Sequence, residues 1–562
     1  MSEFDLAVRG GSVCDGTGEP AYTADVAVRD GRVAAIGRID PSAATTVIDA
    51  DGLWVAPGFI DVHTHYDAQL HFEPTCSPSS WHGVTTVFTG NCGFTFAPAR
   101  SAEDLDWLLA MLSRVEGMSP DGLKEGVSYR GGSFREFLDG LSSGGIGVNV
   151  AANVGHCALR RWVMGDAASE RAATDDEVAQ MCALLRSALA DGAVGFTSSQ
   201  LDLHVAHDGR PVPSNLAEPK ELIALAAAAG EAGAHAIEFI PRTFLPGYEE
   251  ADRDLILEMC RASGLPVSTN TLSKIPHAPD GWKRSLEFAE EAAAQGLRVL
   301  PQFASNHQGA HFSLDTTFLF DEYDTMRSCL TGAPGQRERL LRDPSVRDKL
   351  RVELADWSGK SFLFVPQVLR FEIVHRPEHE RYVDRTVSEV AAERGQDDLD
   401  CFLDVSLAED LRTQFVLAAP PDAARLAATE ELIRSPHVLA GSSDAGAHLL
   451  SFCGADYTTR LLTEWVPDVL TFEQAVARLT TVPAEVHGLT DRGAIRTGAA
   501  ADLLVIDRER LGTSTPRLVS DFPAASSRYV VDATGYAAVL VNGDVLLDGG
   551  RPTGTLPGRI LR

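Results

Sequence analysis

The stretch that decides the fold reads GFIDVHTH and runs from Gly58 to His65. Its apolar start predicts a short buried strand, and two histidines follow at positions i and i+2. Side chains alternate between the two faces of a strand, so His63 and His65 share one face, together with Asp61. Two imidazoles at that spacing can converge on one divalent cation. The alternative is an ordinary pair of histidines at a strand end.

Outward from this stretch, apolar runs alternate with helical patterns, which is typical of βα units and a parallel sheet. Helices are predicted over 103–115, 222–232 and 282–294. Eight βα units favour a closed (β/α)8 TIM-like barrel, an α/β fold, and a doubly wound open sheet is the alternative. The predicted strands are 58–65, 83–91, 147–154, 192–199, 233–240, 265–271, 298–304 and 437–443.

The two ends of the chain predict a second, smaller domain. Short strands separated by turn signals, such as Asp30-Gly31 and Asn542-Gly543, occur at both ends. Neither group is large enough to stand alone, so we predict one β-sandwich assembled from both termini. The expected domains are therefore a β-sandwich of residues 1–55 and 490–562, and a barrel domain of residues 56–489.

The connection between the seventh and eighth predicted strands, residues 305–436, is far longer than an ordinary βα loop. It contains helical patterns, as at 387–394 and 422–434. We predict an insertion over the barrel mouth that acts as a lid or forms part of the substrate pocket. A peripheral packing subdomain is the alternative.

Composition narrows the classes of function. The 562-residue chain has a formal net charge of -30, with 44% hydrophobic and 23% charged residues. This is typical of a soluble globular protein, and the acidic balance argues against binding nucleic acid or an anionic membrane. Nine cysteines without CxxC pairs, and no visible signal peptide or membrane-spanning run, favour a cytoplasmic protein. The oligomeric state stays open, with a homo-oligomer as one option.

Reactive groups in barrel enzymes lie at the C-terminal ends of the strands, where His63 and His65 are expected. The second predicted strand leads to Cys92, which is a metal ligand if ionised, although a buried unreactive cysteine is more common. The eighth leads to Asp444, which could bind a metal through one oxygen and accept a proton from water on the other. The alternative for Asp444 is a helix N-cap.

Four further residues near strand ends are weaker candidates. His156 could polarise the substrate carbonyl or bind its carboxylate, or it is a structural histidine. Arg242 and Lys274 are candidate partners for a substrate carboxylate, although such side chains are usually only solvated. His448 is a candidate substrate-binding residue, a support for the metal ligands, or a packing residue of its loop.

Several motifs in this order resemble the amidohydrolase superfamily: GFIDVHTH at 58–65, NCG at 91–93 and GSSD at 441–444. The resemblance implies metal-dependent hydrolysis of an amide by a (β/α)8 barrel that carries a β-sandwich built from both termini. It implies that His63, His65, Cys92 and Asp444 are metal ligands and that Asp444 is also the general base. The chain is most similar to the N-acyl-D-amino-acid deacylase (D-aminoacylase) branch, through YDAQL at 66–70, SPSSWHGVTTV at 77–87, AAERG at 391–395 and RGAIRTG at 492–498.

The chain departs from that branch at two strand ends. The family's fifth and sixth strands each end in a metal-binding histidine, and the corresponding segments here contain Glu238 and Thr271. Glu238 replaces one histidine as an oxygen ligand, or it supports another ligand or the substrate. Thr271 is a poor ligand for zinc. One divalent metal is therefore favoured over two, with zinc first and manganese or iron as alternatives.

Together these features predict a hydrolase of a small N-acylated amino acid that uses metal-activated water, with Asp444 as general base. Hydrolysis of a cyclic amide, imide or carbamate is the second expectation. The third is a catalytically silent barrel that serves in binding or assembly. The missing strand-end histidines count for that third expectation, and the joint presence of His63, His65, Cys92 and Asp444 counts against it.

Overall fold

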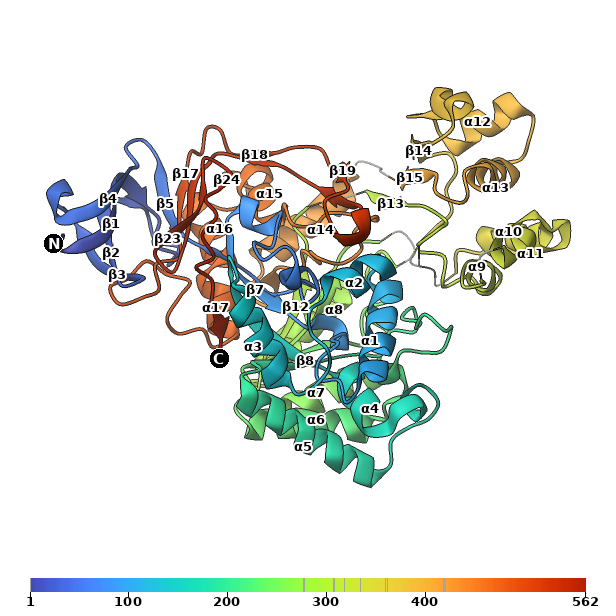
Figure 1. Ribbon diagram of the computed structural model, residues 1–562, viewed down its shortest axis with the longest axis horizontal. Coiled ribbons are helices and arrows are strands. Elements are labelled where there is room, and N and C mark those ends of the chain that lie inside the picture. Colours follow the sequence, from blue (N-terminus) through green and yellow to red (C-terminus); the bar gives the residue numbers. More distant parts are fainter. Residues whose placement is uncertain are drawn as a thin grey trace.

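Eight parallel strands in one continuous order form the centre of the molecule (Figure 1), and a short ninth strand near the C-terminus, β25 (Ile560–Leu561), pairs with one of them. The computed structural model describes residues 2–275, 278–306, 309–317, 319–333, 335–358, 360, 362–417 and 421–562. Each of the eight strands overlaps the stretch predicted for it. In sheet order they are β6 (Phe59–Asp61), β7 (Val84–Thr89), β8 (Asn149–Gly155), β9 (Gly195–Ser199), β10 (Ala236–Ile240), β11 (Val267–Leu272), β12 (Val299–Phe303) and β16 (Leu439–Ala440).

The first and last strands of this sheet meet just beyond their ends. The backbone N–H of Asp444 donates to the carbonyl of His63 at 3.1 Å, and the N–H of His65 donates to the carbonyl of Ala445 at 2.7 Å. Thr64 and Ala445 form a parallel bridge. The predicted (β/α)8 barrel is therefore confirmed, and its closure brings the two histidines beside Asp444.

Helices follow the strands and pack their apolar faces on the barrel. The three helices predicted for this region are present as α1 (Ala102–Val115), α6 (Pro219–Glu231) and α8 (Gly281–Ala294). The α1 helix begins at Ser101, whose side chain accepts from the N–H of Asp104. The others are α2 (Pro120–Gly126), α3 (Phe134–Gly144), α4 (His156–Met164), α5 (Asp175–Asp191), α7 (Glu250–Ser263), α14 (Ala423–Arg434), α15 (Tyr457–Glu464), α16 (Phe472–Leu479) and α17 (Thr481–Val486).

Strands from both chain ends combine in a second, mixed sheet, at the left of Figure 1. In this sheet, β1 (Phe4–Val13) pairs with β4 (Ala44–Asp49) along its first half and with β5 (Trp54–Pro57) along its second. The pairing of β1 with β2 (Tyr22–Arg29) shifts between Val8 and Gly11. A change of partners at a bulge turns a sheet around a corner. The strands are β1 (Phe4–Val13), β2 (Tyr22–Arg29), β3 (Arg32–Gly37), β4 (Ala44–Asp49), β5 (Trp54–Pro57), β17 (Leu503–Ile506), β22 (Tyr536–Val541), β23 (Asp544–Asp548) and β24 (Arg551–Pro552).

Residues 310–417 form a lobe that projects from the barrel at the upper right of Figure 1 and has its own apolar cluster. The lobe lies within the segment predicted as an insertion. It contacts the barrel side where the N–H of His311 donates to the carbonyl of Ser451 at 2.5 Å. Its elements are β13 (Ala310–Phe312), α9 (Asp324–Leu330), α10 (Gln336–Arg342), α11 (Pro344–Ala355), β14 (Leu369–Ile373), α12 (Val387–Arg394), α13 (Asp398–Ala408) and β15 (Gln414–Leu417).

The cysteines and the lengths of the helices can be compared with what the composition predicted. All nine cysteines are buried free thiols. Within the ranges that the structure describes, no helix combines the length and apolar character needed to span a lipid bilayer.

Candidate metal centre

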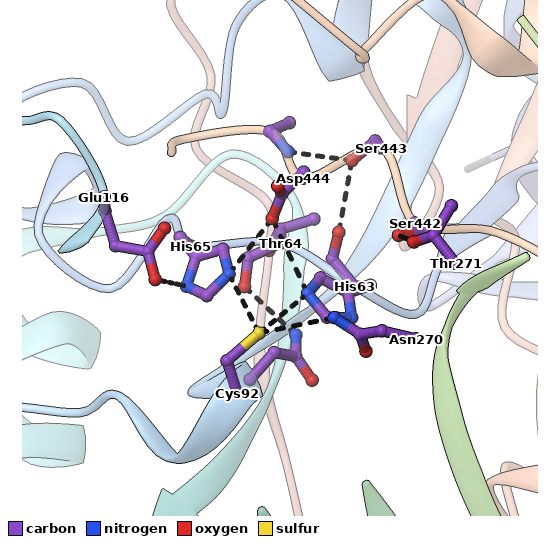
Figure 2. Close-up of polar contacts among 12 residues, drawn as sticks. His63, Thr64, His65, Cys92, Glu116, Asn270, Thr271, Ser442, Ser443 and Asp444 are labelled. Carbon is purple, nitrogen blue, oxygen red and sulfur yellow. Dashed lines mark hydrogen bonds and ion pairs between the residues drawn. The ribbon is translucent and has the colours of Figure 1, made fainter. Parts of the chain in front are cut away.

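Four side chains converge at the C-terminal ends of the barrel strands (Figure 2). Nε2 of His65 lies 3.1 Å from Oδ1 of Asp444, and Nε2 of His63 lies 3.6 Å from the same oxygen. Sγ of Cys92 lies 3.4 Å from Nε2 of His63 and 3.7 Å from Nε2 of His65. The structure thus brings together four of the five candidate metal ligands that the sequence singled out, and Glu238 is the fifth.

These spacings fit a single tetrahedral cation. Ligand atoms bound to zinc at about 2.0–2.3 Å in tetrahedral geometry are roughly 3.3–3.6 Å apart. The four measured separations within the cluster, 3.1–3.7 Å, extend slightly beyond both ends of that range. His63, His65 and Cys92 form a candidate metal-binding group by this geometry, and all three are buried. The donor set of imidazole, thiolate and carboxylate suits zinc.

Local backbone geometry directs two of these side chains inward. Cys92 lies in a short 3-10 turn (Asn91–Gly93) and has a φ of 57°, and Asp444 has a φ of 54°. Both are in the left-handed region, which non-glycine residues rarely adopt and which concentrates at functional sites. Gly446 allows the loop after Asp444 to approach β6, because a Cβ there would be 2.7 Å from the carbonyl carbon of His65.

The electrostatics of the cluster favour a positive charge at its centre. Burial opposes a charged His65, but Glu116 and Asp444 outweigh it and raise the pKa of this ring to about 10. Burial also opposes ionisation of Asp444, but His448 and His65 outweigh it and hold its pKa well below the ordinary value. Burial lowers the pKa of His63 to about 4, which leaves this ring neutral and able to ligate.

The Cys92 thiol is buried among acidic groups. Burial, reinforced by Glu238 and Glu116, raises its pKa well above the ordinary value. A cation in contact with the sulfur would strongly favour the thiolate in this environment. Asn270 donates to the same sulfur from Nδ2 at 3.6 Å.

Glu116 and His448 complete the surroundings of the cluster. Oε1 of Glu116 lies 3.5 Å from Nδ1 of His65, and Oε2 lies 3.6 Å from Nε2 of His448. His448 in turn lies 3.4 Å from Oδ2 of Asp444. Sequence reasoning missed Glu116, which follows the last turn of α1 and belongs to no recognisable motif. Its only local signal is a charged residue directly after an amphipathic helix.

Glu238 and Thr271 stand near the strand ends where the resembled family has histidines. Oε2 of Glu238 accepts the backbone N–H of Cys92 at 2.7 Å, so this side chain helps to fix the backbone that carries the cysteine. Its Oε1 has no hydrogen-bond partner among the described residues. Thr271 hydrogen-bonds to the hydroxyl of Ser442. Neither residue is among the groups whose ligand atoms converge.

His156 lies outside the cluster. The residue opens α4, and its ring is fully buried. Nδ1 contacts Oγ of Ser198 at 2.8 Å, and Nε2 contacts Oε1 of Glu221 at 2.8 Å. Arg160 holds both oxygens of the same carboxylate at 2.6 Å. With both ring nitrogens occupied, His156 has the surroundings of a structural histidine rather than of the predicted catalytic one.

Arg242 and Lys274 also lie apart from the four converging residues. Arg242 forms an ion pair with Asp202 and lines a cavity of about 400 Å³ between the loops after β9 and β10 and the start of the lobe. Lys274 donates from Nζ to the carbonyl of Pro279 at 3.3 Å. In this structure both positively charged side chains are therefore paired with other groups of the protein.

A closed (β/α)8 barrel with two histidines, a cysteine and an aspartate converging at its strand ends defines the class of barrel hydrolases that use a divalent metal. The chain belongs to the amidohydrolase family, whose model matches residues 46–334 and 365–546. It is thus an enzyme that hydrolyses carbon–nitrogen bonds other than peptide bonds, and the predicted superfamily is confirmed.

Curated relatives support the predicted branch. The chain is 29% identical to a D-aminoacylase of Alcaligenes xylosoxydans xylosoxydans, over 99% of this chain and 97% of that protein. It is also 29% identical to an N-acyl-D-aspartate deacylase of the same organism, over 100% of this chain and 95% of the relative. These matches span nearly the whole of both chains, so the likeness is not confined to one motif.

Solved structures support the same branch of the family. The crystal structure of D-aminoacylase superposes with a TM-score of 0.67 at 26% identity over 100% of both chains. An N-acyl-D-glutamate deacylase from Bordetella bronchiseptica gives the same values, and that structure was solved with zinc and a phosphonate that mimics the tetrahedral reaction intermediate. A divalent metal is thus a property of the structural relatives as well as a fit to the residues present here.

Proposed function

We propose that this protein hydrolyses the amide bond of a small N-acylated amino acid, using one zinc ion held by His63, His65, Cys92 and Asp444. The observation that carries this proposal is the convergence of four ligand atoms from β6, the β7 loop and the β16 loop within 3.1–3.7 Å. The curated relatives that span the whole chain support the substrate class, since their names are D-aminoacylase and N-acyl-D-aspartate deacylase.

When bound, a divalent cation supplies Lewis acidity, which polarises a carbonyl group and makes water a stronger nucleophile at neutral pH. The chain supplies the proton transfer. Oδ1 of Asp444 faces the two histidines, so Oδ2 is the oxygen that can accept a proton from the attacking water. The same atom can then return the proton to the nitrogen that leaves when the amide bond breaks.

Asp444 is held firmly for this task. Oγ of Ser443 donates to the carbonyl of His63 at 3.2 Å and accepts the N–H of Ala445 at 3.0 Å. The N–H of Asp444 itself donates to the carbonyl of His63. The base and the first pair of ligands therefore belong to one hydrogen-bonded unit, which favours a fixed distance between them.

One ion is favoured over two because the two family histidines are missing and the segments that replace them do not converge on the cluster. A solved D-aminoacylase, 26% identical over the full chain, is described in terms of activation by one metal and attenuation by a second. That description belongs to the relative, and it is consistent with a site that works with a single ion.

The test combines metal loading with a substrate panel. The purified protein is stripped with a chelator, reloaded with zinc, manganese or iron, and assayed on N-acyl-D-amino acids, N-acyl-L-amino acids and cyclic amides. Hydrolysis of N-acyl amino acids by the zinc-loaded protein is expected. Asp444→Asn should lower turnover by about 10²–10⁴-fold while zinc stays bound.

Asp384→Asn is the matched control, since Asp384 also has a left-handed φ, of 65°, but is exposed on the lobe. Full turnover is expected for this variant. Cleavage of cyclic amides alone would contradict the substrate assignment. No hydrolysis of any compound by the loaded protein would contradict the proposal as a whole.

A further inference from the structure

We propose that Glu116 is a positioning residue of the metal centre, which fixes the ring of His65 so that Nε2 faces the cation. This inference rests on the proposed function, since it presumes that the cluster binds a metal. Glu116 is 2% exposed and lies directly after α1, far from the strand ends along the chain.

The two nitrogens of His65 face different partners (Figure 2). Nε2 faces Asp444 and Cys92, whereas Nδ1 faces Oε1 of Glu116 at 3.5 Å. A metal-binding histidine generally donates its other ring N–H to a carboxylate or carbonyl, which fixes the tautomer and the ring orientation. Glu116 also belongs to a second group of possible ligands, with His65 and Asp444. Because it faces Nδ1, the ring nitrogen turned away from Cys92, we assign it the role of a support for His65.

Glu116 also holds the loop that carries Asp444. Its Oε2 lies 3.6 Å from Nε2 of His448, and its carbonyl accepts the N–H of His448 at 2.5 Å. The same Nε2 of His448 lies 3.4 Å from Oδ2 of Asp444. One residue thus contacts a ligand on the first strand and the loop after the eighth, and so fixes the separation of two ligands.

Stability alone does not explain this glutamate. The backbone N–H of Glu116 still donates to the carbonyl of Leu112, so the residue caps the C-terminal end of α1. A carboxylate is unfavourable at that end of the helix dipole, and burying it adds a desolvation cost. A residue that costs free energy in both respects, and that contacts both His65 of the cluster and His448 beside Asp444, is best explained by function.

The test measures zinc affinity on the full chain by competition with a chromophoric chelator. Glu116→Ala should weaken binding by about 10–100-fold, as is usual when the partner of a metal-binding histidine is lost. Glu116→Gln keeps an acceptor oxygen and the shape of the side chain, so it should fall between Glu116→Ala and wild type. The visible absorption of the cobalt-loaded protein should shift in both variants, because the ring of His65 is no longer fixed.

Glu409→Gln is the matched control. Glu409 is equally buried and contacts a histidine, with Oε1 2.7 Å from Nδ1 of His379, but it lies in the lobe. It should leave zinc affinity and the cobalt spectrum unchanged. Thermal unfolding of the metal-free proteins separates the roles, because a purely structural Glu116 would lower Tm without altering affinity or spectrum.

The outcomes distinguish this inference from the proposed function. Wild-type affinity and spectrum in both Glu116 variants would overturn the positioning role and leave the metal centre intact. If Glu116→Ala does not fold, Glu116→Gln decides alone, by the same two measurements. Absence of zinc binding by the wild-type protein would instead overturn the proposed function.

Discussion

Nδ1 of His65 lies 3.5 Å from Oε1 of Glu116, which joins the first barrel strand to the end of the first long helix. The surroundings of the metal centre therefore extend beyond the strand ends. The proposed ligands come from the short segments after β6, β7 and β16, and the proposed support comes from a helix end. This division of roles leads to separate predictions for ligands, for supports and for residues outside the cluster.

The thiolate is expected to contribute directly to zinc affinity. Cys92→Ser replaces a soft ligand with a hydroxyl that stays protonated, so zinc binding should weaken by at least about 100-fold, more than for the loss of a supporting residue. Chelator competition measures the change. Cys157→Ser, which alters another buried thiol near Ser214, is the control and should bind zinc normally. Equal affinity in the two serine variants would remove Cys92 from the ligand set.

Glu238 is expected to support Cys92 rather than to ligate. Glu238→Gln keeps an acceptor for the N–H of Cys92 and should retain one zinc per chain. Glu238→Ala leaves that buried N–H unsatisfied and should lower the free energy of unfolding by about 1–3 kcal/mol. Metal analysis and denaturant unfolding check both statements. Loss of zinc from a folded Glu238→Gln variant would identify Glu238 as a ligand after all.

His156 is expected to matter for stability and not for turnover. Replacement by phenylalanine removes the contacts to Ser198 and Glu221 and should lower the free energy of unfolding by about 1–3 kcal/mol. The kcat/KM of the zinc-loaded variant should stay close to the wild-type value, measured below the unfolding temperature. A large fall in kcat without a change in stability would restore His156 to the catalytic residues.

The sequence predicted the barrel well because its signal is repeated. Eight apolar runs, each followed by a helical pattern or a turn, leave few alternatives, and all eight became strands. The convergence of His63, His65, Cys92 and Asp444 could also be predicted, since each lies directly beyond a strand end, where the backbone path nearly determines the position. Glu116 could not be found this way, because its approach to His65 depends on how α1 packs against the barrel.

The contacts of two other candidate residues could not be predicted, for one physical reason. His156 and Arg242 also lie near strand ends, but side chains there can turn toward any nearby partner of opposite charge. His156 turned to Glu221 and Arg242 to Asp202, and neither carboxylate is close in sequence. Proximity to a strand end predicts where a Cα lies and not which partner the side chain selects.

A buried histidine outside the cluster is expected to set part of the acid sensitivity of the fold. Burial, with His235 and Arg298 nearby, lowers the pKa of His487 from 6.5 to about 3, and its ring packs on Phe88 at 4.4 Å. The unfolded chain therefore binds an extra proton between about pH 6.5 and 3. The stability from this group is present above pH 6.5 and is lost as the pH falls toward 3.

His487→Gln should remove this contribution. The slope of unfolding free energy against pH, at most about 1.4 kcal/mol per pH unit for one group, should be shallower in the variant below pH 6.5. Denaturant unfolding at a series of pH values measures it. His375→Gln, on an exposed ring of the lobe, should keep the wild-type slope. Parallel curves for wild type and His487→Gln would contradict the assignment.

The proposed centre is one zinc ion held by two histidines, a cysteine and an aspartate. X-ray absorption at the zinc edge of the fully loaded protein measures these neighbours. We expect one sulfur at about 2.3 Å with nitrogen and oxygen neighbours at about 2.0–2.2 Å, and loss of the sulfur contribution in Cys92→Ser. A zinc ion with no sulfur neighbour in the wild-type protein would contradict it.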